Sequence, residues 1–198
     1  MAAIWGNIEE AKDYVGNLPA DGYICQILRV KHDAKDHYLE IEYDIADGEY
    51  KDFFSDAAAS LGWWPGSFRK YYEGRTPEKD KYVKQFFKSF LMAIERSNDK
   101  FVANKFDLDK ESHVKALEGK MIGLTIGIKK VWGKNDGKEH INNYVDMCRS
   151  IEEIREGNFK IPKDTEDTRY KPKYASEPVN ELNDADFIAL QDDDDVPF

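Results

Sequence analysis

Apolar and polar residues alternate along several segments of the chain, which is the pattern of half-buried β-strands. In the clearest segment, apolar residues from Leu39 onward occupy every second position, and Glu40, Glu42 and Asp44 lie between them. The other segments are rich in β-branched and aromatic residues, which favour strands. The pattern predicts five strands, at residues 22–31, 38–46, 50–54, 120–132 and 140–149.

The last two predicted strands form a hairpin. Asn135-Asp136-Gly137 lies between them and is a strong signal for a tight turn. Gly123 and Gly127 alternate with apolar residues in the first of the two strands. Glycine inside a strand permits tight curvature or the close approach of another segment, so we expect one of these at both positions.

A helix is predicted between the third and fourth strands. Thr76 is a suitable N-cap, and Pro77 suits the first helical position. From Tyr82 to Ile94, apolar residues recur at helical spacing, with lysines on the other side. A shorter helix is predicted at 150–157, capped by Ser150.

Five strands with a helix between the third and fourth is the order of a five-stranded OB-type barrel. The fold class expected is therefore mainly β with a helical insertion at about 57–115, within a domain of residues 1–162. Residues 163–198 contain seven Leu, Ile, Val or Phe, three prolines and many acids. This composition predicts a disordered acidic tail.

The net charge of the chain is −10, but the charges are unevenly distributed. Residues 63–106 hold 10 Lys or Arg, 5 Asp or Glu, and 11 of the 26 aromatic residues. Residues 163–198 hold 4 Lys or Arg and 11 Asp or Glu, and the rest of the chain holds 15 and 23. A basic, aromatic stretch thus lies within an acidic protein, and the local field decides where a phosphate backbone binds.

This basic stretch supplies what a single DNA strand needs from a protein, namely cations along the phosphates and aromatic rings against the bases. Its candidate contact residues are Trp63, Trp64, Phe68, Arg69, Lys70, Tyr71, Tyr72, Arg75, Lys81, Lys84 and Lys88. The alternative is structural: Trp63, Trp64 and Phe68 pack the insertion onto the barrel, and the cations form a solvated face. For any single aromatic ring, the pattern favours packing in the fold. For the segment as a whole, it favours contact with DNA.

Both predicted hairpins add candidates for the same surface. In the second hairpin, Lys130 and Trp132 share a strand face, so they would reach a bound strand together. In the first, Arg29 and Lys31 share a face. Beside the first hairpin, Glu40 and Glu42 would repel phosphate. For the second hairpin, the alternative is an exposed tip whose tryptophan, Trp132, packs in a minor core.

The sequence offers little for catalysis or for membrane insertion. Its four histidines lack zinc spacing with the cysteines, and no glycine-rich phosphate loop is found. No apolar run reaches the ~18 residues of a membrane span. The first six residues do not resemble a signal peptide, and the two cysteines fit a reducing compartment. We expect a protein without enzymatic activity, cofactor or metal, in the cytoplasm of a bacterial host cell.

The end of the sequence combines acid with an apolar tip. Asp192, Asp193, Asp194 and Asp195 are followed by Val196, Pro197 and Phe198. Phe198 suits an apolar pocket of another protein, its carboxylate suits an Arg or Lys, and the aspartates suit a basic rim. The alternative is a solvating tail, as most runs of aspartate are.

This tip resembles that of bacterial and phage single-stranded DNA-binding proteins. Residues 149–162 resemble the closing segment of such proteins from phages and prophages of Gram-positive bacteria, and the segments 18–23 and 38–49 are also similar. The resemblance implies an OB-fold core that coats single strands. It also implies a tail that recruits replication, recombination or repair proteins. A homo-oligomer is compatible with it, but the long aromatic insertion argues against carrying over an oligomeric state.

Two other functions stay open at this point. The first is an acidic phage accessory protein, either a mimic of DNA charge or a binder of host proteins, that does not itself bind DNA. The acidic balance outside residues 63–106 favours it. The second is a nuclease or recombinase subunit, which the lack of a positioned cluster of metal ligands disfavours.

Overall fold

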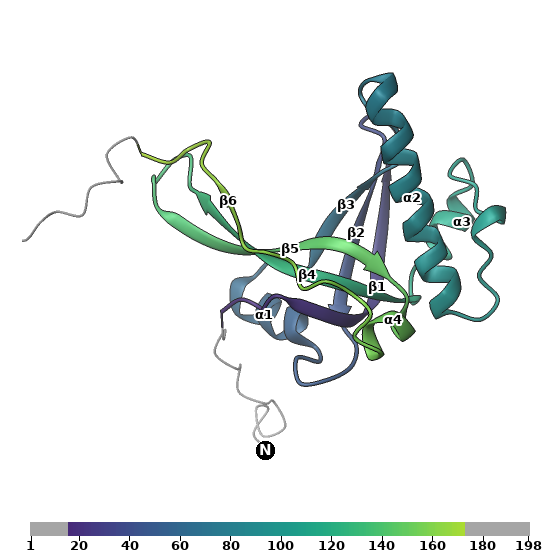
Figure 1. Ribbon diagram of the computed structural model, residues 1–198, viewed down its shortest axis with the longest axis horizontal. Helices are drawn as coiled ribbons and strands as arrows, with labels where there is room; N and C mark the ends of the chain where they lie inside the picture. Colours follow the sequence, from purple (N-terminus) through teal and green to yellow (C-terminus); the bar gives the residue numbers. More distant parts are fainter. Residues whose placement is uncertain (1–15, 173–198) are drawn as a thin grey trace, which may run out of the picture.

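The computed structural model describes residues 16–172, which form a mainly β structure with helices beside the sheet (Figure 1). In chain order the elements are β1 (Asp21–Asp33), β2 (Tyr38–Ile45), α1 (Phe53–Leu61), β3 (Ser67–Tyr71), α2 (Pro77–Ser97), the 3-10 turn η1 (Ala103–Lys105), α3 (Glu111–Lys115), β4 (Met121–Trp132), β5 (Glu139–Arg149), α4 (Ile151–Arg155) and β6 (Thr165–Asp167).

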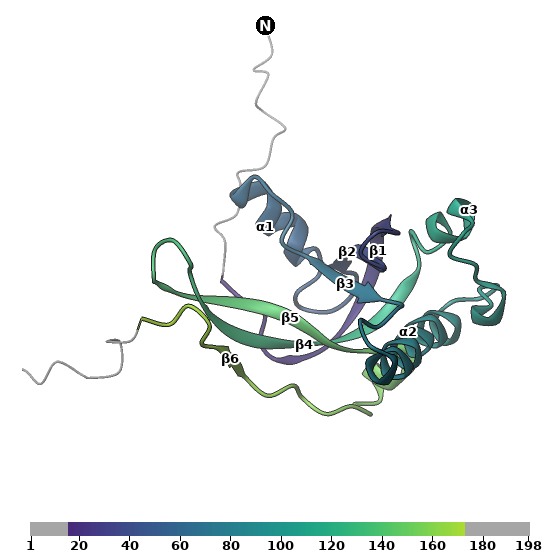
Figure 2. The same cartoon turned by 90° about the horizontal axis from the view of Figure 1, so that it is seen from above.

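The strands form one sheet in the order β3-β2-β1-β4-β5, and neighbours along this path are antiparallel. The short β6 pairs with β4 in parallel. Because β3 and β5 are the two ends of the path, the sheet within residues 16–172 is open. The predicted closure into a five-stranded barrel is therefore not seen. Figure 2 shows β4 and β5 running on as a long arm, with β6 beside it.

Four of the five predicted strands are confirmed, with small shifts at their ends. The third is wrong: its predicted segment, 50–54, leads into helix α1, and the third strand is Ser67–Tyr71. The expected helical insertion at 57–115 therefore contains a strand of the sheet. Gly66 holds the loop before β3 against β2, because its carbonyl accepts the N–H of Tyr43 at 2.9 Å.

The described structure continues past Pro162, where the sequence analysis ends the folded domain. Thr165–Asp167 form β6, and Asp167 lies 3.3 Å from the Nζ of Lys129 on β4. Arg169 holds the pKa of Asp167 well below its usual range, so this carboxylate is ionised at neutral pH. The predicted boundary at 162 is thus too early, and the rest of the predicted tail, 173–198, lies outside the described residues.

Helix α2 buries an apolar stripe against the sheet. Phe87, Phe90, Leu91 and Ile94 are buried at the spacing expected of one helix face, and they belong to a single core cluster with residues of β1, β2 and β4. Full burial of one such side chain contributes about 1.5–3 kcal/mol. Because α2 contacts β3, β4 and β5, it covers the core at the place where the two edge strands do not pair.

The predicted caps are confirmed. The Thr76 side chain accepts the N–H of Lys79 at the start of α2, and Pro77 is its first residue. Ser150 and Glu153 form a capping box at α4. At neutral pH the Glu153 carboxylate is ionised, because the backbone N–H of Ser150 lowers the pKa of this group.

The two glycines of β4 allow close approach, as expected. A Cβ at Gly123 would lie 2.6 Å from the Ile154 side chain of α4, and one at Gly127 would lie 2.7 Å from the Tyr144 ring. Both distances are shorter than real carbon contacts, so a side chain at either position would displace α4 or Tyr144.

Asp44 connects the end of β2 to the start of α1. It is 5% exposed, and its Oδ1 accepts the N–H groups of Ile45 and Phe54 at 2.8 and 2.9 Å. Its Oδ2 accepts the N–H of Ser55 at 3.0 Å and also the Ser55 hydroxyl. The expectation that Asp44 lies on an exposed face with Glu40 and Glu42 is therefore wrong. The carboxylate instead satisfies N–H groups of the first helical turn.

We predict that Asp44→Ala lowers the free energy of unfolding by about 2–4 kcal/mol, because a buried N–H group left without an acceptor costs about 1–3 kcal/mol. Urea denaturation measures this. Asp36→Ala is the control, since Asp36 is exposed in the β1–β2 turn and its loss is expected to cost less than about 0.5 kcal/mol. Equal stability of Asp44→Ala and the control would contradict the role given to Asp44.

Candidate nucleic-acid interface

Three neighbouring strands bring charged and aromatic side chains to one face of the sheet. In the strand register, Arg29 of β1 pairs with Glu42 of β2, and Lys31 pairs with Glu40. On the other side of β2, Arg69 of β3 pairs with Glu40. Directly paired residues point to the same face of a sheet. We name this surface the sheet face, and its residues are Arg29, Lys31, Tyr38, Glu40, Glu42, Arg69 and Tyr71.

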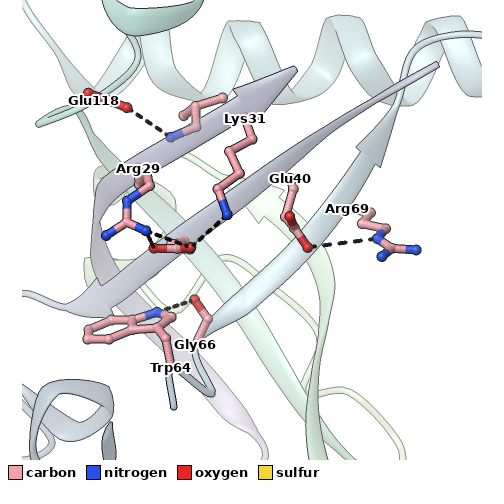
Figure 3. A network of polar contacts seen from close by, with 9 residues as sticks. Arg29, Lys31, Glu40, Trp64, Gly66, Arg69 and Glu118 are labelled. Carbon is pink, nitrogen blue, oxygen red and sulfur yellow. Dashed lines mark hydrogen bonds and ion pairs between the residues drawn. The ribbon is translucent and has the colours of Figure 1, made fainter. Parts of the chain in front are cut away.

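Each cation of the sheet face lies beside a carboxylate (Figure 3). Arg29 and Lys31 lie 3.4 and 3.9 Å from the oxygens of Glu42, and Arg69 lies 4.0 Å from Glu40. The three cationic side chains are 55–61% exposed. The carboxylates are less exposed: Glu40 is 33% exposed and Glu42 is 16% exposed. An exposed pair contributes only about 0–1 kcal/mol, so a phosphate can replace Glu40 beside Arg69 at less cost than it can replace Glu42.

Aromatic rings lie among these charges. Tyr71 is 40% exposed and packs against Tyr38, with ring centroids 5.4 Å apart. Tyr38 itself is buried beneath Arg69, whose guanidinium carbon is 4.7 Å from the ring centroid. Burial raises the pKa of Tyr38, so its hydroxyl is neutral at physiological pH. Tyr71 is thus the ring of this pair that a base can reach.

The two tryptophans before β3 have different environments. Trp63 is 61% exposed, whereas Trp64 packs against the core and donates its indole N–H to the carbonyl of Gly66 at 2.9 Å (Figure 3). Trp63 therefore fits the predicted stacking role. The structural alternative fits Trp64 better.

Alternation along β3 sends two predicted contact residues into the protein. Phe68 packs between Tyr43 and Phe90, at centroid distances of 5.6 and 6.5 Å. Tyr72, just after β3, packs against Phe87, and its hydroxyl lies 2.8 Å from the Nε2 of His32. The prediction that Phe68 and Tyr72 stack on bases is not supported, because both rings are engaged in the fold. Lys70 also points away from the sheet face.

The other predicted cations of this stretch lie away from the sheet face. Lys81, Lys84 and Lys88 are on α2, and Arg75 precedes it. Lys84 pairs with Asp80 at 2.7 Å. Lys81, Lys88 and Arg75 are exposed.

The second hairpin is less accessible than the sequence suggests. β6 and the segment after it contact Trp132: the Nζ of Lys171 is 5.5 Å from the Trp132 ring, and the indole N–H lies 3.4 Å from Glu166 of β6. Trp132 therefore has neighbours from the chain itself. Lys130 lies 3.5 Å from Glu139 in an exposed pair, as the cations of the sheet face do with their carboxylates.

Sequence reasoning missed two exposed rings on α2. Tyr82 and Phe86 are 62% and 49% exposed, although they follow the helical spacing that predicts a buried face. They lie in the first half of the helix, and the buried residues begin at Phe87. Their position next to Lys81 and Lys84 is the signal that could have identified them.

No protein-family model matches this sequence, and no curated protein is significantly similar to it. Within residues 16–172, no group of three or more His, Cys, Asp or Glu is placed to hold a metal ion. None of the helices in that range is both long and apolar enough to span a bilayer.

We predict that Trp63→Phe lowers the acrylamide quenching of tryptophan fluorescence more than Trp64→Phe does, because Trp63 is the more exposed ring. Stern–Volmer constants of the two variants measure this. A larger drop in Trp64→Phe would mean that the loop before β3 is arranged differently.

Proposed function

We propose that this protein binds single-stranded DNA with little sequence preference through the sheet face, without enzymatic activity, during phage DNA replication, recombination or repair. The observation that supports this is the grouping of three exposed cations with the exposed ring of Tyr71 on three neighbouring strands. Trp63, in the loop before β3, is a further exposed ring. Cations follow the phosphates, and rings stack on unpaired bases, at about 1–3 kcal/mol per base. Stacking needs unpaired bases, so duplex DNA would bind more weakly.

The strand order also supports the proposal. In β3-β2-β1-β4-β5, the first three strands are consecutive and a helix lies between the third and fourth, which is the path of an OB-type barrel opened between β3 and β5. In that architecture the face of the second and third strands is a common surface for nucleic acids. The sheet face lies on the same strands.

The charge balance of the sheet face leads to a sharp test. We predict that Arg69→Ala weakens binding to oligo-dT by about 3–10-fold at low salt and reduces the salt slope by about 0.7, the value of one phosphate contact on a single strand. Glu40→Gln should strengthen binding by about 2–5-fold, because it frees Arg69 from its exposed partner. Fluorescence anisotropy at several salt concentrations measures both.

Lys160→Ala is the control, since Lys160 is exposed and lies outside the sheet face. It changes the net charge as Arg69→Ala does but removes no proposed contact. Equal effects of the two substitutions on DNA affinity would mean that binding depends on the net charge of the protein and not on a contact made by Arg69. Failure of the wild-type protein to bind any single strand would instead favour the acidic protein-binding function.

The sequence Asp192–Phe198 lies outside the described residues, and we propose that it recruits a replication, recombination or repair protein. Deletion of Phe198 should abolish capture of that partner, because the aromatic ring and its carboxylate fill the partner's pocket. DNA affinity should change by less than about 2-fold, since no sheet-face contact is removed. Pull-down from host lysate with the two forms measures this. Capture of the same proteins by the truncated form would overturn the pocket model.

A further inference from the structure

A groove of about 380 Å³ lies between α2 and the end of β5, away from the sheet face. We name it the helix groove. Its cationic side chains are Lys88 and Arg96 from α2 and Arg149 from β5. Its other lining residues are Gln85, Ser89, Met92, Ala93, Met147, Cys148 and Glu153. Apolar side chains thus line a site that carries three positive charges.

The positive charge of the helix groove is only partly neutralised. Glu153 is the single carboxylate among the lining residues, and it lies 3.6 Å from Arg149. Its other oxygen accepts the N–H of Ser150 at 2.8 Å. Within residues 16–172, Lys88 and Arg96 form no ion pair, although Arg96 as well as Arg149 helps to lower the pKa of Glu153. The buried Nε of Arg149 has no acceptor in that range. This differs from the sheet face, where each cation has a carboxylate partner.

Lys70 extends from β3 toward helix α2. Its neighbours Arg69 and Tyr71 point to the sheet face, and Lys70 points to the other side of β3, where its Nζ lies 5.8 Å from the Phe86 ring. Phe86 precedes Ser89, which lines the helix groove, by one helical turn on α2. Because β3 is an edge strand, a flexible ligand can pass around it from one surface to the other.

Exposed rings accompany these cations. Tyr82 and Phe86 lie one helical turn apart, on the flank of α2 that continues through Ser89 and Ala93 of the groove. Successive bases of a single strand stack on such rings. Tyr82 and Phe86 are not among the lining residues of the helix groove, so a short acidic peptide held in the groove would leave them without a role, whereas a longer strand would reach them. The combination of rings and unpaired cations therefore favours a nucleic acid.

We propose that the helix groove binds the phosphate backbone of single-stranded DNA that passes around β3 from the sheet face, with Tyr82 and Phe86 stacking on its bases. This inference rests on the proposed function and extends it, because it gives the protein a second binding surface. A short strand would fill the sheet face alone, and a longer strand would contact both surfaces.

The test compares Lys88→Ala/Arg96→Ala with wild-type protein on two lengths of oligo-dT. One is about 6 nucleotides long and the other about 20, beyond the ~4–16 nucleotides of one OB-type surface. For the long strand we expect about 10-fold weaker binding at low salt and a salt slope reduced by about 1.4, two phosphates at about 0.7 each. Binding of the short strand should be unchanged.

Lys105→Ala/Lys115→Ala is the matched control, because it removes the same charge from η1 and α3, outside the helix groove. Glu153→Gln should strengthen binding of the long strand, since glutamine keeps the capping box and removes the groove's carboxylate. The inference is overturned if Lys88→Ala/Arg96→Ala binds the long strand like the control double variant.

A second measurement does not depend on substitution. The chain has two cysteines, of which Cys25 is fully buried and Cys148 lines the helix groove. We expect the long strand to slow the reaction of the Cys148 thiol with a disulfide reagent, and the short strand to leave its rate unchanged. An unchanged rate at saturating long strand would also overturn the inference.

The same variants separate this inference from the proposed function. If Arg69→Ala has no effect and Lys88→Ala/Arg96→Ala removes binding, the sheet-face proposal fails and the helix groove is the primary site. If the groove double variant has no effect and Arg69→Ala weakens binding, the inference fails and the proposed function stands. Tighter binding of a synthetic Asp192–Phe198 peptide than of oligo-dT, lost in the groove double variant, would assign the groove to an acidic peptide and overturn the inference.

Discussion

The packing of α2 across the gap between β3 and β5 determines most of what this structure can do. The two edge strands do not pair within the described residues, so their sides of the core need another cover. Phe87, Phe90 and Ile94 supply it, and each buried side chain contributes about 1.5–3 kcal/mol. Because α2 packs against the side of the sheet that carries the core residues, the sheet face on the opposite side stays exposed. The same packing creates the helix groove against β5.

β3 carries the functional consequence of this arrangement. Its five residues alternate between the two sides of the sheet, so Phe68 anchors the strand in the core while Arg69 and Tyr71 face solvent. A strand buried on both sides could not present cations, and a fully exposed one would lack the packing that holds it in register. An edge strand with one apolar anchor satisfies both requirements.

The electrostatic arrangement bears on the proposal that this acidic protein binds a phosphate backbone. Glu40 and Glu42 neutralise the cations of the sheet face in the absence of a ligand. The Arg69–Glu40 pair is the more exposed and therefore the weaker, whereas Glu42 is only 16% exposed. Exchange of a carboxylate for a phosphate therefore costs least at Arg69. Phosphate contacts also release counterions, which favours binding at low salt.

Local signals in the sequence predicted the elements whose stabilising contacts are themselves local. The cap at Thr76, the capping box at Ser150 and the turn at residues 135–137 each depend on residues within four positions. Alternation also located β2 and β4. The same alternation placed Arg29 and Lys31 on one strand face and Glu40 and Glu42 beside Tyr38, which agrees with the strand register.

The misassigned elements depend on contacts between distant residues. Helix α1 begins where Asp44, about ten residues earlier, accepts N–H groups of its first turn, and no periodicity within 53–61 reveals this. The short β6 lies in a polar segment that is joined to β4 by strand pairing and by the ion pair between Lys129 and Asp167. For the same reason, the roles of Phe68, Lys70 and Tyr72 could be separated only once β3 had been placed in the sheet.

The contrast between the two surfaces bears on how a long strand would be held. Cations with carboxylate partners must give up a weak interaction before they bind phosphate, whereas Lys88 and Arg96 have no ion pair within residues 16–172 to break. The helix groove would therefore keep more of the electrostatic free energy per phosphate, and the sheet face would contribute more through stacking. Binding at both surfaces would bend the strand around β3, because Arg69 and Lys70 face opposite sides of one edge strand. A single strand can follow that bend, and a stiff duplex cannot.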